Sequence, residues 1–144
     1  MHLGNYLHTN GATLSPTSLA HLWYHAVRLT KESLEPATYH SRLTPASFLV
    51  EAAEDGEVRL SLSDPGRIME IKDAPERLPP WQMAAPEQTE LVEGRGTISA
   101  NVYNLGVLGY RIFAGAMPYG RRSGIAGVES LIHYSQLTRG NCEL

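Results

Sequence analysis

The residues of this chain whose types and spacing could do chemistry are few. His21 and His25 lie four apart in a segment of helical periodicity, a spacing that can place two imidazoles on one metal ion. The intervening Leu22-Trp23-Tyr24 lacks the glutamate that acts as general base in the zinc-hydrolase motif, so we interpret the two histidines as a surface pair. No serine lies in a nucleophile-elbow pattern, which leaves hydrolase chemistry without support.

Two further segments hold polar residues in a more informative order. His40-Ser41-Arg42-Leu43-Thr44-Pro45-Ala46-Ser47 leads into the apolar Phe48-Leu49-Val50, and Asp64-Pro65-Gly66 follows later in the chain. By itself Asp64-Pro65-Gly66 predicts an ordinary turn, because proline and glycine favour turn geometry. Arg121-Arg122, together with the nearby Arg111, predicts solvated charges close to a helix end.

Two more motifs complete the set, Ala85-Pro86-Glu87 and Asn101-Val102-Tyr103-Asn104-Leu105-Gly106-Val107. In this order and spacing, the four motifs resemble those of the C-terminal lobe of the protein kinase superfamily. The resemblance is clearest over residues 1–120. Residues 1–7 are similar to the end of the kinase hinge and the short helix that follows it, and residues 16–31 are similar to the long helix before the catalytic loop. It implies a kinase-like C-terminal lobe, with the N-terminal lobe absent from this chain.

The resemblance also implies that the chain has lost the residues on which kinase chemistry depends. Arg42 stands where the catalytic aspartate belongs, and a guanidinium cannot be that base because it stays protonated and has no acceptor. Thr44 replaces the lysine that supports the transferring phosphate, and Ser47 replaces the asparagine that holds a magnesium ion. We therefore expect no intact catalytic residue at these degenerate positions.

Asp64 matches the aspartate of the kinase magnesium loop and is the single metal-binding and cofactor-binding residue retained. A gapless alignment would instead put Leu62 in that place, so either alignment implies a weakened metal site. Because Arg42 and Asp64 would lie close together, a further hypothesis is that the guanidinium pairs with the carboxylate and occupies the metal position.

Three residues match structural positions of the family. His40 corresponds to a packed histidine of the scaffold, and Glu87 corresponds to the glutamate that anchors the end of the activation segment. Asn101 takes the position of an aspartate that braces the catalytic loop through hydrogen bonds to its backbone, and an amide can still accept such bonds.

The elements that must position these residues are mostly helical. Ser15 before Pro16 predicts a helix start, and apolar residues then recur at helical spacing for about fifteen residues until the helix ends before Pro36. Residues 99–114 are apolar nearly all round, which predicts a helix buried on most faces at the centre of the domain. Residues 128–137 predict a last, weaker helix.

Strand signals are sparse. Residues 48–50 and 57–62 flank Glu54-Asp55-Gly56, whose glycine suits a tight reversal, so we predict a short β-hairpin. Residues 67–98 hold several prolines, glycines and charges, which predict a long and mostly irregular loop. The expected fold class is mainly α (α+β), a kinase-like C-terminal lobe with one short hairpin.

Composition predicts one domain over residues 1–144, because this length and 42% hydrophobic residues suffice for a single core. The net charge of -3 provides no basic surface, so neither nucleic acid nor an anionic membrane is favoured as a partner. Cys142 is the single cysteine and has no disulfide partner, and the N-terminus lacks a signal-peptide profile. These features favour a reducing, cytoplasmic location.

The functional expectation is a catalytically inactive, pseudokinase-like domain that binds a protein partner as a scaffold or regulator in signalling and needs no cofactor. The alternative is a fragment of an ATP-binding serine/threonine protein kinase that keeps residual phosphotransfer, with ATP and Mg²⁺, once an N-terminal lobe completes it. A third interpretation is a decayed gene fragment without a selected function. The oligomeric state stays open.

Overall fold

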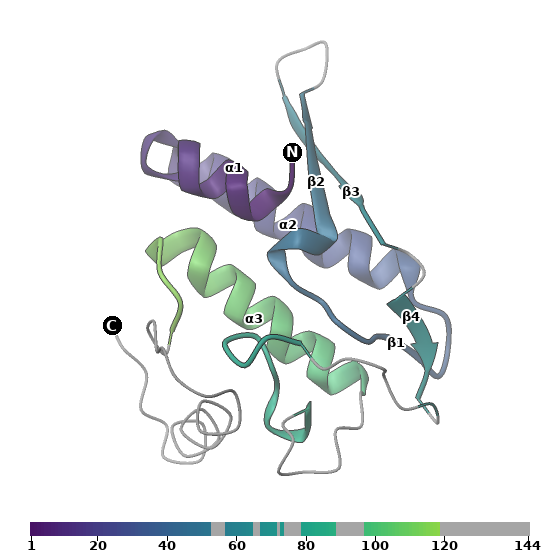
Figure 1. The fold of residues 1–144 in the computed structure, drawn as a ribbon. Coiled ribbons are helices and arrows are strands. Elements are labelled where there is room, and N and C mark those ends of the chain that lie inside the picture. Colours follow the sequence, from purple (N-terminus) through teal and green to yellow (C-terminus); the bar gives the residue numbers. More distant parts are fainter. Residues whose placement is uncertain (53–56, 65–66, 72, 74–78, 89–96, 119–144) are drawn as a thin grey trace.

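The computed structural model describes residues 1–52, 57–64, 67–71, 73, 79–88 and 97–118. Within these residues, three α-helices and two small antiparallel sheets form an α+β fold (Figure 1). The helices are α1 (Leu3–Asn10), α2 (Pro16–Ser33) and α3 (Ile98–Ala114), and the strands are β1 (Thr38–His40), β2 (Phe48–Ala52), β3 (Val58–Leu62) and β4 (Ile68–Glu70).

Helix α2 begins where the sequence predicts. The Ser15 hydroxyl accepts a hydrogen bond from the Ser18 backbone N–H at 3.1 Å, and Pro16 occupies the first turn, where its missing N–H costs nothing. The helix ends at Ser33, ahead of Pro36, and is slightly longer than expected. Its buried residues are four apart, Leu22, Ala26 and Thr30, which places them on one face toward the core.

Helix α3 is also confirmed. The Thr97 hydroxyl caps its N-terminus, and its C-terminus stops at Gly115, whose φ of 70° is the left-handed conformation that glycine adopts without strain. The predicted burial on most faces is wrong, because Ile98, Val102 and Phe113 are exposed. Among the described elements, α3 makes its most extensive contacts with α2, β1 and the turn Pro86–Gln88.

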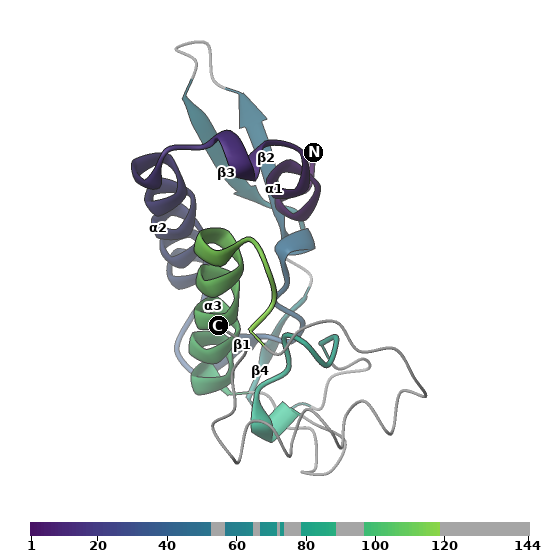
Figure 2. The same ribbon diagram turned by 90° about the vertical axis from the view of Figure 1, so that its left-hand side faces the viewer.

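The predicted hairpin is formed by β2 and β3, which pair antiparallel in a register that places Phe48 opposite Leu62 and Ala52 opposite Val58. The reversal expected at residues 54–56 lies outside the described residues. The hairpin packs against α1 and α2 at one end, and its other end projects beyond the helices in both views (Figures 1 and 2).

The described part of residues 67–98 is mostly irregular, as predicted, but it also contributes a strand to a second sheet that was not predicted. Within that span, β4 pairs antiparallel with β1, and Pro86–Gln88 forms a short 3-10 turn. The sequence did not indicate this strand, because three residues are too few to show alternation and the partner strand lies far back in the chain. The predicted helix over residues 128–137 lies outside the described residues.

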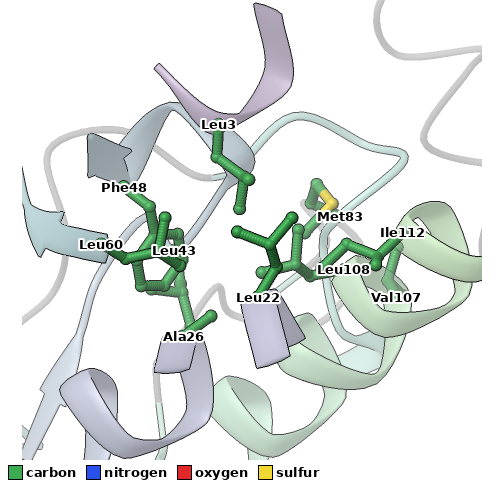
Figure 3. Close-up of a cluster of buried hydrophobic side chains, with 10 residues drawn as sticks. All are labelled: Leu3, Leu22, Ala26, Leu43, Phe48, Leu60, Met83, Val107, Leu108 and Ile112. Carbon is green, nitrogen blue, oxygen red and sulfur yellow. The ribbon is translucent and has the colours of Figure 1, made fainter. Parts of the chain in front are cut away.

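One hydrophobic core joins all three helices and the hairpin (Figure 3). Helices α2 and α3 lie side by side (Figure 2), while α1, the hairpin and the segment that holds Met83 close the core around them. The buried members are Leu3, Leu22, Ala26, Leu43, Phe48, Leu60, Met83, Val107, Leu108 and Ile112. No helix among the described residues is both long and apolar enough to cross a membrane.

Candidate functional site

A pocket of about 310 Å³ lies where the loop after β1 meets the segment after β3. Arg42, Thr44, Ser47 and Asp64 all line it, so the fold brings together the four residues to which the sequence assigned degenerate catalytic and metal positions. Arg67 lines the same pocket and was not singled out from the sequence. The remaining lining residues are His2, Ala46 and Ser63.

Hydroxyl groups build the loop that forms one wall of the pocket. The Thr44 side chain accepts a hydrogen bond from the Ala46 N–H at 3.2 Å, and the Ser47 side chain accepts one from the Thr44 N–H at 3.1 Å. This reciprocal cap starts the 3-10 turn Pro45–Ser47. The Ser63 hydroxyl donates to the Ala46 carbonyl at 2.8 Å, which fastens the end of the hairpin to the turn.

The Asp64 carboxylate pairs with Arg67, whose Nε lies 2.9 Å from Oδ2. The hypothesis of an Arg42–Asp64 pair is therefore wrong for this structure. Arg67 is favoured because it lies three residues after Asp64 in the same turn, where its backbone N–H also donates to the Asp64 carbonyl at 3.2 Å. No group of three or more metal-ligating side chains surrounds Asp64 or any other described residue.

Arg42 lines the pocket, and its guanidinium has no hydrogen-bond or ion-pair partner among the described residues. Its Nε is buried and makes no hydrogen bond within the described part of the chain. Its backbone is held in place, since the Arg42 N–H donates to His40 Nδ1 at 3.3 Å and the Arg42 carbonyl accepts from the Ser47 hydroxyl at 3.3 Å. The loop is thus fixed, while the guanidinium Nε stays unsatisfied.

Asn101 holds the start of this loop from α3. Its Oδ1 accepts from the His40 N–H at 2.7 Å, and its Nδ2 donates to the His40 carbonyl at 2.8 Å. Both residues are buried. These are bonds of the kind expected from a residue that braces the loop through its backbone.

The His40 ring is a packed, neutral group. Burial lowers the pKa of His40 to about 4, an effect that the nearby Asp64 carboxylate partly opposes and the Arg67 guanidinium reinforces. Because Nδ1 accepts from the Arg42 N–H, the ring proton is assigned to Nε2, which has no acceptor among the described residues. His40 therefore belongs to the scaffold and has no free base to offer at neutral pH.

A buried network of side-chain amides attaches the segment before Glu87 to α3. The Asn104 side-chain amide donates to the Met83 carbonyl and, at 3.1 Å, to Gln88 Oε1, which also accepts from the Ala85 N–H. Neither Asn104 nor Gln88 was predicted from the sequence to have such a role. The available signal was Asn104 itself, a second amide three residues after Asn101 in a mostly apolar helix.

Glu87 makes a local contact, in which the Thr97 hydroxyl donates to Glu87 Oε1 at 3.3 Å. Because Thr97 is also the N-cap of α3, this bond connects the end of the segment to the start of the helix. The carboxylate lies away from the pocket lining.

Chemically, the pocket offers cationic and hydroxyl donors and one carboxylate that is already paired. No described lining residue is an unpaired carboxylate that could act as a general base. Neither a protein-family model nor a curated protein matches this chain.

Proposed function

We propose that the chain is a catalytically inactive, protein-kinase-like domain that works as a protein-binding scaffold or regulator inside the cell. The observation that carries this proposal is Arg42, a guanidinium at the pocket position where the resemblance requires the catalytic aspartate. A permanent cation with no acceptor cannot orient or deprotonate a substrate hydroxyl.

The expected rate loss is large. General acid–base catalysis typically contributes about 10² to 10⁴ in rate, and preorganised electrostatic stabilisation of the transferring group contributes on the order of 10² or more. Arg42 removes the first contribution, and Thr44 and Ser47 remove cationic and metal-binding parts of the second. The engagement of Asp64 by Arg67 further weakens the last metal ligand.

The arrangement of the backbone supports the kinase-like interpretation. Asn101 on α3 binds the backbone at His40, the strand that precedes Arg42 pairs with the strand that follows Asp64, and the Met83 segment is tied to α3. All four motifs that carry the resemblance are therefore connected through α3 or through the pocket. These backbone connections are present although the catalytic positions are altered. That combination is expected if selection acts on binding and not on catalysis.

The exposed apolar side chains of the described residues do not gather at the pocket. The pocket lining is mostly polar. In the described part of the chain, exposed apolar groups lie largely on α2 and α3, where Trp23 meets Phe113 edge-on with ring centroids 6.4 Å apart.

The second candidate is an ATP-binding serine/threonine kinase fragment that regains phosphotransfer with an N-terminal lobe. One observation favours it: Asp64, the matched magnesium ligand, does line the pocket. A magnesium ion would have to compete with Arg67 for the Asp64 carboxylate. Arg67 is only partly buried, so a divalent ion could displace it.

Calorimetric titration of ATP with Mg²⁺ separates the two candidates. We expect no Mg²⁺-dependent binding in the micromolar range, and no difference between the wild-type protein and Asp64→Ala. Asp73→Ala is the matched control, since Asp73 is an exposed aspartate outside the pocket lining. Micromolar, Mg²⁺-dependent binding that is lost in Asp64→Ala and kept in Asp73→Ala would establish the kinase alternative instead.

A further inference from the structure

We propose that the pocket between Arg42 and Arg67 binds a phosphoryl group directly as an anion, without a metal ion. This site goes beyond the scaffold function, and it depends on the geometry of the described residues rather than on the kinase resemblance. The ligand chemistry is that of a phosphate monoester or a terminal nucleotide phosphate.

The first observation is the unsatisfied guanidinium. Arg42 Nε is buried in the wall of the pocket and has no hydrogen-bond partner among the described residues. Buried polar groups in folded proteins nearly always have a partner, and an unpaired donor on a cation is especially costly. The other N–H groups of this guanidinium also have no partner among the described residues, so an anion in the pocket that Arg42 lines would give the cation an acceptor.

The second observation is the balance of charge. Two arginines line the pocket against a single carboxylate, Asp64. Arg67 uses its Nε for Asp64, and a guanidinium carries five N–H donors, so its terminal nitrogens can serve a second acceptor. The pocket therefore carries a net positive charge, which favours an anion and opposes a divalent cation.

The third observation is which hydroxyl groups of the pocket donate hydrogen bonds within the protein and which accept them. The Ser47 and Ser63 hydroxyls donate to the carbonyls of Arg42 and Ala46, so their protons are already used. The Thr44 hydroxyl instead accepts from the Ala46 N–H, which leaves its proton for an external acceptor. Arg42, Arg67 and Thr44 thus provide donors, and a phosphoryl group consists of acceptors.

Phosphoryl is favoured over a simple carboxylate by geometry and charge. The planar guanidinium fork matches two oxygens of one phosphate, and two such forks can bind a dianion from two sides. The pocket of about 310 Å³ is roomier than a lone oxyanion needs, so the group that carries the phosphate can enter with it.

The test uses the full chain with EDTA present and ionic strength held constant. Inorganic phosphate is titrated while backbone amide chemical shifts are followed by NMR, and millimolar, saturable binding is expected. Arg42→Gln should weaken this binding at least about tenfold. Arg28→Gln is the matched control, since Arg28 lies on α2 in an exposed pair with Glu32 and should leave the affinity unchanged.

Arg67→Gln is the second variant and keeps the test decisive if Arg42→Gln does not fold. It should also weaken phosphate binding, because it removes the other cation. Parallel titrations with phosphoserine and with ATP, both in EDTA, distinguish the source of the phosphate: tighter binding of phosphoserine indicates a phosphorylated side chain, and tighter binding of ATP indicates a nucleotide.

Three results would overturn the anion site: no saturable phosphate binding, binding that is unchanged in both arginine variants, or acetate binding as tightly as phosphate. A requirement for Mg²⁺ would also overturn it. None of these results decides the scaffold function, which is tested separately by Mg²⁺-dependent ATP binding at Asp64.

Discussion

At the scale of single residues, Asn101 holds the loop that carries Arg42 in place. It satisfies both backbone groups of His40, and the two residues lie 61 positions apart in the sequence. A buried N–H or carbonyl without a partner costs about 1–3 kcal/mol, so one side chain prevents two such costs. The position of the loop that carries Arg42 therefore depends on an amide of α3.

We expect Asn101→Ala to lower the free energy of unfolding by about 2–5 kcal/mol, because it leaves both His40 backbone groups unsatisfied. Asn101→Asp should also destabilise the protein, since a carboxylate can accept from the His40 N–H but cannot donate to the His40 carbonyl. Urea denaturation measures both changes. The exposed Asn5→Ala serves as control and should stay within about 0.5 kcal/mol; an equal effect of Asn5→Ala and Asn101→Ala would contradict the bracing role.

His40 makes stability depend on pH. Its pKa falls from 6.5 to about 4 on folding because the ring is buried, so below pH 6.5 the unfolded chain binds a proton that the folded chain does not. The contribution of the neutral His40 ring to the free energy of unfolding is therefore fully present above pH 6.5. It is lost as the pH falls toward 4, by on the order of 3 kcal/mol in total.

Urea denaturation of the wild-type protein and His40→Gln at several pH values between 6.5 and 4 isolates this effect from the titration of carboxylates. The free-energy difference between the two proteins should shrink as the pH falls, because the variant has no imidazole to protonate. His8→Gln, an exposed histidine on α1, should follow the wild-type curve. Parallel curves for the wild-type protein and His40→Gln would show that burial does not perturb this ring.

At the scale of elements, the contact between α2 and α3 depends on a missing side chain. Trp23 on α2 lies over Gly109 on α3, and its Nε1 donates to the Leu105 carbonyl at 3.1 Å. A Cβ added at Gly109 would lie 2.7 Å from that Nε1, closer than packed atoms approach. The absence of a side chain at position 109 lets the indole reach the helix backbone.

Gly109→Ala should therefore destabilise the protein by about 1 kcal/mol, even though alanine is the better helix former, because Trp23 must move and lose its bond to Leu105. Gly106→Ala is the matched control on the same helix. An added Cβ there meets nothing within 4 Å, so this change should stabilise the protein by about 0.5–1 kcal/mol. Thermal unfolding measures both variants, and opposite signs are the expected result. If both variants raise the melting temperature, the indole does not pack against Gly109.

At the scale of the whole molecule, one core makes the described elements depend on each other. Leu22 of α2 lies among side chains from α1, the hairpin and α3 (Figure 3), and it is 3% exposed. Removal of its side chain leaves a cavity that several elements border, so the effect should spread over the whole domain.

We expect Leu22→Ala to lower the free energy of unfolding by about 2–5 kcal/mol. Tryptophan fluorescence and far-ultraviolet circular dichroism should report the same urea midpoint, because Trp23 and Trp81 are attached to parts that share this core. Val102→Ala, at a position 65% exposed, is the control and should change stability little. Two separate midpoints for the two probes would mean that the domain unfolds in independent parts.

The sequence by itself determined the elements whose signals lie within a few neighbouring residues. Ser15 and Pro16 mark the start of α2, Gly115 marks the end of α3, and the apolar runs of the hairpin mark β2 and β3. Capping, turn and periodicity signals depend on neighbouring residues only, so they can be recognised without knowledge of the rest of the fold. The grouping of Arg42 with Asp64 near one site was also expected, because the resemblance to the kinase C-terminal lobe implies it.

Tertiary structure alone decided which groups meet. The pairing of Asp64 with Arg67 rather than Arg42, and the pairing of β1 with β4, depend on where segments lie in space. That Arg42 Nε has no partner among the described residues depends on where those residues lie in space. The exposed side of α3 follows from which elements pack on it, because burial is a property of the neighbours that a residue has and not of its own hydrophobicity.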